Sequence, residues 1–563
     1  RAGVDAGDRW ESQPGRERFV LLVEVTVGER SELLNIPVLL SEEAVPELAD
    51  FEIGSYRTGG DGSVPEGTAS AADGASSFLR RAVSQAGALL DRRRSQARDT
   101  PSGQQTGATR DAARPADGST VHVYDAVGDP VFMDRVLRMM DAQLTEGGVL
   151  RHGMGLHGRH TGALNTDYRI AGAEQIHVIT SEQSNTSVIL RPADRGEDES
   201  ALREDAVIVK FFRVVGEGRN PDVEVGVRLT AHRSSAVPAT AGWIDAQWRQ
   251  GLVTTSGQLA VAAQFLDRSR DAWEMTVAAA TEGRDFTELA RDLGVTTARV
   301  HADLLAAFDP TEADDDARRR FLEDLTGRVR WAWESCGERF EQLRPELERV
   351  LEELAEIREI PPLQRIHGDY HLGQVLHSDA QGFRILDFEG EPLRPIKERV
   401  RPDVALRDVV GMLRSFDYAG AMAGRENGRD MGEWTRAVSD AFLEGYSSRS
   451  GVPVDTDGVL FRALWLDKAL YEVVYEERNR PDWVRVPADA VVRSLEHARS
   501  RTVNSENHES PSTPSRTEDF VTTEHPRPSD PHAASDRAPV SQDAADAARP
   551  AARPDGAVRA EST

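Results

Sequence analysis

Two stretches that are poor in large apolar residues limit how much of this chain can fold around a core. Residues 501–563 contain one aromatic side chain, Phe520, and residues 58–119 are similarly rich in Gly, Ser, Ala and Arg. Such compositions bury too little apolar surface to offset the loss of chain entropy, so we expect both stretches to be disordered. Without these 63 and 62 residues, 438 of the 563 remain, which suffices for about two to three domains.

The charge balance and the cysteine content argue against several classes of protein. The chain has 95 acidic and 68 basic residues and a net charge of −27 at pH 7, which disfavours nucleic-acid binding and docking on anionic membranes. No apolar run approaches the roughly 20 residues that a membrane-spanning helix needs. Cys336 is the only cysteine, so no intramolecular disulfide can form, and we expect a reducing, cytoplasmic setting.

The hydrophobic periodicity predicts a mixed α+β protein in four parts. Apolar and β-branched residues at 17–27, 33–40 and 120–127 indicate strands of an N-terminal subdomain, which the stretch 58–119 interrupts. A second region is rich in predicted strands, and a third in helical stripes. The expected parts are residues 1–130, 131–265 and 266–500 and the tail 501–563.

A short hairpin and a lone lysine in the second region are suited to holding phosphates. Strands are predicted at 175–180, 186–190 and 206–214. The polar turn between the first two could place backbone N–H groups and hydroxyls over a nucleotide. Its residues are Ser184, Asn185, Thr186 and Ser187. Lys210 lies in the third strand and is one of three lysines, whereas the other 65 basic residues are Arg. Glu224, in a predicted helix, is its expected acidic partner, as in kinases.

Two acidic motifs in the helical region could meet at one divalent metal ion. The first is HGDYHLGQ (367–374), and the second places Asp387 at the end of an apolar strand. Mg²⁺ takes few protein oxygen ligands and keeps water or phosphate oxygens. We assign Gln374 and Asp387 to Mg²⁺, which leaves Asp369 as the base for an attacking hydroxyl in ATP-dependent phosphoryl transfer. Of the two histidines in the first motif, His367 is expected to brace the loop and His371 to line the acceptor pocket.

Several motifs resemble the bacterial maltokinases, in the aminoglycoside-phosphotransferase-like branch of the protein-kinase-like superfamily. They are HGDYHLGQVL (367–376), DFEGEPLRPIKER (387–399), PDVALRDVVGMLRSFDYA (402–419) and LDKALYEVVYEERNRPDW (466–483). Shorter matches are EQSNTSV (182–188), VIVKFFR (207–213) and SRDAWEM (269–275). The resemblance covers about residues 120–500 and is weaker in the N-terminal strands.

The resemblance implies a bilobal kinase-like α+β fold, with a capped, β-rich N-terminal lobe and a mainly helical C-terminal lobe. It implies a hinge near residues 262–265, where Ala263 and Phe265 would contact ATP. The implied reaction uses Mg²⁺ and converts ATP and maltose into ADP and α-maltose 1-phosphate. This reaction would feed glycogen and α-glucan synthesis from trehalose, and a trehalose synthase acting in trans is the expected protein partner.

The helical lobe would supply the sugar contacts. The candidates implied by the resemblance are Arg407, Asp408, Tyr471, Glu472, Tyr475, Glu476 and Asn479. Carboxylates and amides pair with vicinal hydroxyls, while aromatic rings cover the apolar face of a pyranose. The chain departs from the family in the charged loop 192–205, in the insertion 58–119 and in the tail.

Two alternative functions stay open. A related sugar kinase, such as a glucosamine kinase, shares the catalytic loop, and acceptor specificity cannot be derived from one sequence. A non-catalytic nucleotide-binding scaffold belongs to a different class, and its signature would be the loss of Lys210, Asp369 or Asp387, all of which are present. A protein kinase is disfavoured because no Ala-Pro-Glu segment follows Asp387.

Overall fold

The computed structural model describes residues 2–13, 15–27, 30–57, 120–147, 154–164, 166, 169–179, 185–193, 206–309, 314–391 and 399–508. The chain divides into two units, residues 1–504 and 505–563. The elements described below belong to the first unit, apart from the last residues of the final helix. No helix in the described ranges is long and apolar enough to cross a membrane.

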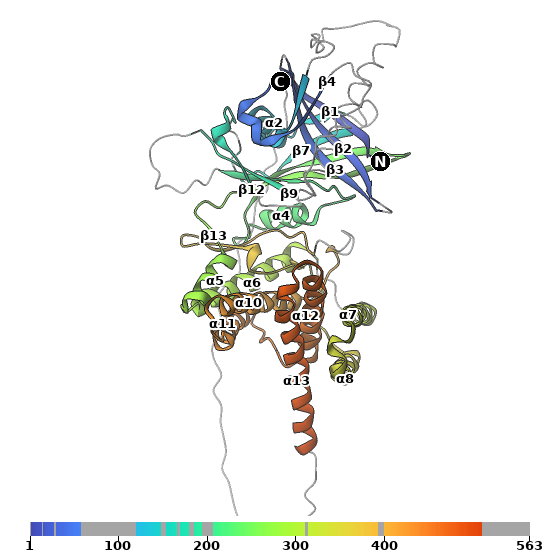
Figure 1. Cartoon of the computed structure of the whole chain (residues 1–563), viewed down its shortest axis with the longest axis vertical. Coiled ribbons are helices and arrows are strands. Elements are labelled where there is room, and N and C mark those ends of the chain that lie inside the picture. The colour runs from blue at the N-terminus through green and yellow to red at the C-terminus, as the bar shows by residue number, and fades with distance from the viewer. Residues whose placement is uncertain are drawn as a thin grey trace, which may run out of the picture. The chain divides into compact units, whose positions relative to one another are not determined.

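A five-stranded antiparallel sheet forms the N-terminal part. Its order is β1–β2–β3–β5–β4, and its strands are β1 (Ala2–Gln13), β2 (Arg16–Val27), β3 (Arg30–Ser41), β4 (Glu52–Arg57) and β5 (Thr120–Asp125). Figure 1 shows β1, β2 and β3 side by side. Because side chains alternate along a strand, Val20 and Leu22 face a core shared with the next sheet, while Leu21 and Val23 face a separate core.

A seven-stranded antiparallel sheet follows and carries Lys210 in β10. Its order is β6–β7–β11–β12–β10–β9–β8, and its strands are β6 (Thr145–Gly147), β7 (Met154–His160), β8 (Ile176–Ile179), β9 (Asn185–Leu190), β10 (Val207–Phe212), β11 (Thr240–Gln250) and β12 (Val253–Gln264). Asn35 of β3 joins the two sheets, because its Nδ2 donates to the carbonyls of Phe212 and Leu259 at 3.2 Å each. The first sheet thereby fixes the end of the strand that bears Lys210.

Two helices pack on these sheets, and each begins at a proline behind a side-chain cap. Helix α2 (Pro130–Asp141) is capped by Asp129, which also forms a buried bidentate ion pair with Arg18. Helix α4 (Pro221–Ala231), which Figure 1 shows next to the seven-stranded sheet, is capped by Asn220. Its Val223 packs with Phe212 and Val261 of that sheet.

The second half of the first unit is built mainly from helices around one large core. They are α5 (Ala272–Glu282), α6 (Thr287–Ala307), α7 (Asp315–Ser335), α8 (Arg344–Ala355), α10 (Leu406–Asn427), α11 (Gly432–Ser450), α12 (Val459–Asn479) and α13 (Arg485–His508). Helices α6 and α11 approach closely because glycines face each other's backbones. A Cβ on Gly294 would lie 2.1 Å from the Phe442 carbonyl oxygen, and one on Gly445 would lie 2.0 Å from that of Arg291.

A small third sheet presents the two acidic loops. It consists of β13 (Arg270–Asp271), β14 (Val375–Ser378) and β15 (Gly382–Ile385), paired antiparallel in that order. Its side chains Val375, Phe383 and Ile385 are buried in the helical core. The loop 367–374 therefore enters this sheet, and the loop after residue 385 leaves it, at the same place.

The predicted α+β class and most predicted strands agree with this architecture. The predicted hairpin corresponds to β8 and β9, and β9 also pairs with β10. The predicted N-terminal strands correspond to β2, β3 and β5. The predicted boundary at residue 500 falls within α13, which continues through residues 501–508, and the predicted division into four parts stays a prediction. The stretches 58–119, 194–205 and 509–563 lie outside the described residues, so the predicted disorder of the insertion and tail stays a prediction.

Candidate active site

Lys210 extends from β10 toward three carboxylates of the acidic loops and of α4. Its Nζ lies 2.6 Å from Asp387 Oδ1, 2.7 Å from Glu389 Oε1 and 3.3 Å from Asp222 Oδ2. Burial opposes the charge of Lys210, but the three carboxylates outweigh it and raise the pKa of this lysine well above its ordinary value. The lysine is therefore cationic at neutral pH and links the seven-stranded sheet to the loop after β15.

The acidic partner on α4 is Asp222 rather than the predicted Glu224. Asp222 Oδ1 accepts the backbone N–H of Phe388 at 3.0 Å, while its other oxygen reaches Lys210. Glu224 instead forms an ion pair with Arg365 at 3.5 Å. Residues two apart on a helix point in different directions, so only one of these acids can face Lys210. The sequence offered both acids as partners of Lys210, and the rotation of α4 against β10 decides which of them faces the lysine.

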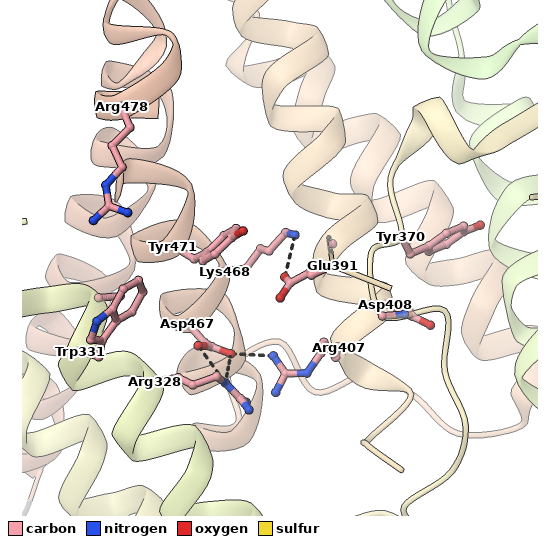
Figure 2. A pocket seen from close by; sticks show the side chains of 13 residues that line it. Arg328, Trp331, Tyr370, Glu391, Arg407, Asp408, Asp467, Lys468, Tyr471 and Arg478 are labelled. Carbon is pink, nitrogen blue, oxygen red and sulfur yellow. Dashed lines mark hydrogen bonds and ion pairs between the residues drawn. The ribbon is translucent and has the colours of Figure 1, made fainter. Parts of the chain in front are cut away.

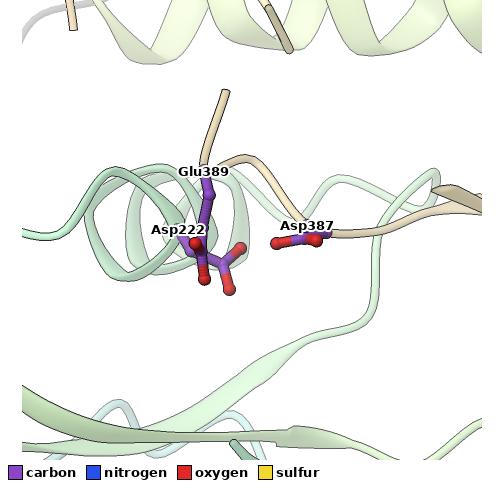
Figure 3. A group of neighbouring side chains, drawn as sticks. All are labelled: Asp222, Asp387 and Glu389. Atoms are coloured by element: carbon purple, nitrogen blue, oxygen red, sulfur yellow. The ribbon is translucent and has the colours of Figure 1, made fainter. Parts of the chain in front are cut away.

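Three carboxylates around Lys210 form a group that could hold a metal ion. Oxygen atoms of Asp222, Asp387 and Glu389 all lie within 4.8 Å of one another, and Figure 3 shows the three side chains gathered between α4 and the loop after β15. Burial raises the pKa of Glu389 and outweighs the opposing effect of Lys210. Carboxylate oxygens are the donors that Mg²⁺ prefers. The predicted ligand Gln374 is near, because its backbone carbonyl accepts the N–H of Leu386 at 2.9 Å.

Asp387 has an uncommon backbone conformation for a residue with a side chain. Its φ is +61°, a left-handed value that costs free energy outside glycine and recurs at functional sites. The residue comes two positions after the end of β15, directly after Leu386, whose N–H donates to the Gln374 carbonyl of the neighbouring loop at 2.9 Å. This conformation turns the carboxylate toward Lys210, with which it makes the shortest of the three contacts.

The loop that carries Asp369 is held from behind by Asp408 of α10. Asp408 Oδ2 accepts the backbone N–H of His367 at 2.7 Å, and Oδ1 accepts that of Gly368 at 2.9 Å. His301 Nε2 lies 3.1 Å from the same Oδ2. Burial of Asp408 opposes its charge, but His301 and the backbone hydrogen bonds outweigh burial and lower its pKa. Asp408 was a predicted sugar contact; it borders the cavity described below, yet its oxygens are engaged in bracing the loop.

His367 joins the two acidic loops, as its predicted bracing role requires. Its Nε2 lies 2.8 Å from the Leu386 carbonyl oxygen, and its Nδ1 lies 3.3 Å from the backbone nitrogen of Asp369. The imidazole therefore donates from Nε2 and accepts at Nδ1. The ring also packs on Phe388, with centroids 4.9 Å apart. These contacts fix the spacing between the loop of Asp369 and that of Asp387.

Asp369, the predicted base, contacts a lysine that approaches from the helical side. Its Oδ1 lies 3.5 Å from Nζ of Lys468, which also lies 3.4 Å from Glu391 Oε1. Burial alone would raise the pKa of Asp369, but Lys468, His371 and His367 outweigh burial and lower it. Asp369 is therefore ionised at neutral pH, as a residue that accepts a proton or a hydrogen bond from a hydroxyl must be.

A cavity of about 540 Å³ opens beside this loop. It is bordered by Gly368 and Tyr370 of the loop, by Glu391, and by side chains of α7, α10 and α12. Figure 2 shows the Lys468–Glu391 pair and the rings of Trp331 and Tyr471 around it. Of the other charged lining residues, Asp467 is bound by Arg407 at 2.6 Å and by Arg328 at 3.1 Å, and Arg478 also borders the cavity.

The predicted hairpin residues are placed at the edge of the carboxylate group. Asn185 Nδ2 donates to Glu389 Oε1 at 3.3 Å, and Thr186 Oγ1 accepts from Arg213 at 2.9 Å. Ser184 lies outside the described residues. The hairpin therefore does reach the acidic loop, whereas its contact with a nucleotide stays a prediction.

The other predicted ATP contacts lie on or beside β12 and its neighbours. Ser187 is buried in β9. Ala263 pairs with Ile208 of β10, and the N–H of Phe265 donates to the Ala206 carbonyl at 3.0 Å. The chain then leaves the seven-stranded sheet for the helical region, as the predicted hinge requires. Nothing in the geometry tests their contact with ATP.

The predicted sugar contacts divide into two groups. Arg407 and Tyr471, like Asp408, border the cavity. The others have different surroundings and are not among its lining residues; they are His371, Glu472, Tyr475, Glu476 and Asn479.

Each member of the second group has a partner outside the cavity lining. Glu472 forms an ion pair with buried Arg414 at 2.7 Å, and Glu476 accepts from Tyr418 at 3.1 Å. Glu472 and Glu476 lie four and eight residues after Lys468, on the same side of α12, so their partners on α10, and not a different helix face, distinguish them from Lys468, which borders the cavity. Tyr475 packs under Arg480, Asn479 donates to the Tyr475 carbonyl, and His371 Nδ1 accepts from Gly373.

Several residues of the site were not predicted from the sequence. They are Asp222, Arg328, Trp331, Glu389, Glu391, Asp467 and Lys468. Lys468 carried a usable signal, since it is one of three lysines in the chain. Trp331 and Arg328 carried none, because α7 reaches the cavity from about 40 residues before the catalytic loop, with no motif of its own.

Comparison with known proteins supports the predicted superfamily. Residues 171–442 match the family described as "Phosphotransferase enzyme family" (APH). A glucosamine kinase of Mycolicibacterium smegmatis is 27% identical over 340 residues, which cover 57% of this chain and 80% of that protein. A glucosamine kinase of Streptacidiphilus jiangxiensis is 29% identical over 320 residues, which cover 52% and 69%.

Solved structures confirm the fold. A glucosamine kinase in complex with glucosamine, ADP and inorganic phosphate superimposes with a TM-score of 0.53 at 18% identity, covering 87% of this chain and 93% of that chain. A second crystal structure, crystal form A of a glucosamine kinase, gives 0.52 at 19% identity. The predicted kinase-like α+β fold is therefore confirmed. The comparisons support the aminoglycoside-phosphotransferase-like resemblance, and they do not show the narrower maltokinase assignment.

Proposed function

We propose that this chain is an ATP-dependent sugar kinase, which transfers a phosphoryl group to a sugar hydroxyl. The observation that carries the proposal is the position of Asp369. It is ionised, lies on a braced loop beside a cavity, and is joined through His367 to the loop in which Asp387 meets Lys210. A base on the acceptor side and a lysine with carboxylates on the nucleotide side are the parts that phosphoryl transfer needs.

In the proposed reaction, Asp369 accepts the proton of the acceptor hydroxyl as the hydroxyl oxygen bonds to the γ-phosphorus of ATP. The bond from that phosphorus to the β-phosphate oxygen breaks, and ADP leaves. Lys210 would hold the phosphates, while Asp387, Glu389 and Asp222, with the predicted ligand Gln374, would hold Mg²⁺. Bound Mg²⁺ supplies neutralisation of the charge on the phosphate oxygens.

The comparisons favour glucosamine as the acceptor over maltose. Both curated relatives described above are glucosamine kinases, and so are the two solved structures with matching folds. Glucosamine is therefore the first acceptor to test, and in this case the chain would be a glucosamine kinase.

Maltose, the acceptor implied by the sequence motifs, stays as the second candidate because of the cavity's lining. Trp331 is 50% exposed and borders the cavity together with Tyr471, so a second pyranose ring would find an aromatic surface. The cavity's carboxylates already have cationic or imidazole partners; they are Glu391, Asp408 and Asp467. An ammonium group of glucosamine would have to compete for them, whereas a neutral sugar would not.

The test is ADP release by the full chain with Mg-ATP against glucosamine, maltose, glucose, trehalose and an aminoglycoside, with the product position assigned by NMR. Asp369→Asn is the matched inactive variant. Turnover on glucosamine alone supports the first acceptor, and turnover on maltose with product at the anomeric oxygen supports the second and makes the predicted trehalose synthase partner worth testing. Absence of turnover on every sugar, with ADP still bound, contradicts the kinase proposal and favours the nucleotide-binding scaffold.

A further inference from the structure

Lys468 occupies a position that the reaction described above leaves unused. It lies on α12, and its ammonium bridges Asp369 at 3.5 Å and Glu391 at 3.4 Å. These two acids come from the two different acidic loops. Its side chain is 21% exposed and borders the acceptor cavity. Lys468 is therefore the point at which the acceptor side of the site contacts the base.

The neighbours of Lys468 on α12 continue this connection into the cavity. The ring of Tyr471, one turn later, lies 5.8 Å from the Lys468 ammonium, a distance at which a cation is attracted to an aromatic face. Asp467 holds Arg407 and Arg328 at the cavity wall. A sugar that contacts this wall would thus act on the same helix that fixes Lys468.

The contact with Asp369 leaves one oxygen of the base for the acceptor. Lys468 approaches Oδ1, and within the described residues no side-chain partner is recorded for Oδ2. A carboxylate held through one oxygen by a cation presents the other in a defined direction. This geometry suits a base that must receive a hydroxyl proton along one line.

We propose that Lys468 is a positioning residue of the kinase reaction, which orients Asp369 and keeps it ionised from the acceptor side while Glu391 holds the lysine in place. The inference rests on the proposed kinase activity and adds to it a residue that acts through the base. Loss of the ammonium at position 468 removes both the orientation and the favourable charge.

The titratable and charged groups around Asp369 predict the direction of the pH effect. They come from α12, from the catalytic loop and from the chain after β15, and they are Lys468, His367, His371, Glu391 and Arg399. Burial raises the pKa of Asp369, and Lys468 is the largest opposing influence. Without this cation the pKa of Asp369 rises, because the largest influence that opposes burial is removed. The acid limb of the rate profile should therefore move to higher pH.

The experiment measures kcat/KM between pH 4.5 and 9 for the full chain with its best sugar, comparing wild type with Lys468→Met and Lys468→Arg. We expect Lys468→Met to lose about tenfold or more in kcat and to shift the acid limb upward. Lys468→Arg should restore the wild-type limb because it restores the charge. Arg462→Met is the matched control, since it removes another ion pair of α12, that with Glu353, and should leave the limb unchanged.

An unfolding experiment separates this inference from the proposed function. Denaturant midpoints are measured for Lys468→Met, Asp369→Asn and the double variant, with Lys468→Gln as a second neutral replacement if Lys468→Met does not fold. Non-additive midpoint shifts are expected because the two side chains interact. Additive shifts, or an unmoved acid limb in the neutral variant, overturn the role of Lys468. A wild type that phosphorylates no sugar overturns the kinase proposal instead, and the midpoints still decide whether Lys468 and Asp369 are coupled.

Discussion

Replacing Asp408 with asparagine tests whether this residue braces the catalytic loop or binds the acceptor. The carboxylate accepts backbone N–H groups from His367 and Gly368 and lies within hydrogen-bonding distance of His301. An asparagine oxygen can serve the side that faces His367 and His301, but its NH₂ then faces the N–H of Gly368. One bond to a charged group is lost and two are weakened, so we expect a loss of about 3–5 kcal/mol in the free energy of unfolding. That is a large share of the roughly 5–15 kcal/mol typical of folded proteins.

The assay is denaturant unfolding at several pH values, with the exposed Asp440 of α11 changed to asparagine as the control. The control should change stability by less than about 0.5 kcal/mol. The folded-state pKa of Asp408 is lowered, so its stabilisation is present above the unfolded-state pKa of about 4 and is lost as the pH falls through the folded-state value. The difference between wild type and Asp408→Asn should therefore shrink at acid pH.

The kcat and the KM for the sugar of the Asp408→Asn variant distinguish a bracing role from a sugar contact. Substitution of a bracing residue should lower kcat, because the loop that carries Asp369 loses the anchor at Gly368 and keeps only a weakened one at His367. A sugar contact should instead raise the KM for the sugar and leave stability within about 0.5 kcal/mol of wild type. If Asp408→Asn is as stable as the Asp440→Asn control and only its sugar KM rises, the bracing role is refuted and the original sugar-contact prediction is restored.

Three further substitutions address the other parts of the site. Asp369→Asn should still bind ADP in calorimetry while losing about 100-fold or more in kcat, and near wild-type turnover would remove it from the base role. Asp222→Asn should raise the KM for ATP more than Glu224→Gln does, because Asp222 is the one of these two acids that contacts Lys210. Equal effects of the two substitutions would contradict this assignment. Trp331→Ala should raise the KM for maltose by about three- to tenfold and leave that for ATP unchanged. An unchanged KM for maltose would exclude stacking.

The sequence was most informative where residues close together in the chain determine the position of a candidate functional side chain. Strand Val207–Phe212 and the hairpin before it follow from β-branched residues and a polar turn. The loops of Asp369 and Asp387 follow from their place at the ends of paired strands. In each of these cases the candidate functional residue lies within a few residues of the strand that positions it. The secondary structure and the proposed role of the residue could therefore be predicted from the same short stretch of sequence.

Side chains on helices were harder to assign, because the rotation of a helix against its neighbours decides which face meets the site. Asp222 and Glu224 differ by two positions on α4, and their partners differ entirely. On α12, Lys468 and Glu472 lie four residues apart on one side of the helix, yet Lys468 borders the cavity while Glu472 pairs with Arg414 of α10. Periodicity identifies the helix and its two faces, but tertiary packing alone determines which face carries function.

The acids that follow β15 show how one short segment can serve both sides of a transfer site. Asp387 and Glu389 contact Lys210, which comes from the seven-stranded sheet, whereas Glu391 contacts Lys468, which comes from α12. Gly390, between the last two acids, has a φ of +71°, a value that glycine adopts without strain. The turn separates Glu391, which contacts Lys468, from Glu389, which contacts Lys210. Two of the chain's three lysines are thereby held by residues 387–391, which would couple the position of the proposed phosphate lysine to that of the proposed base.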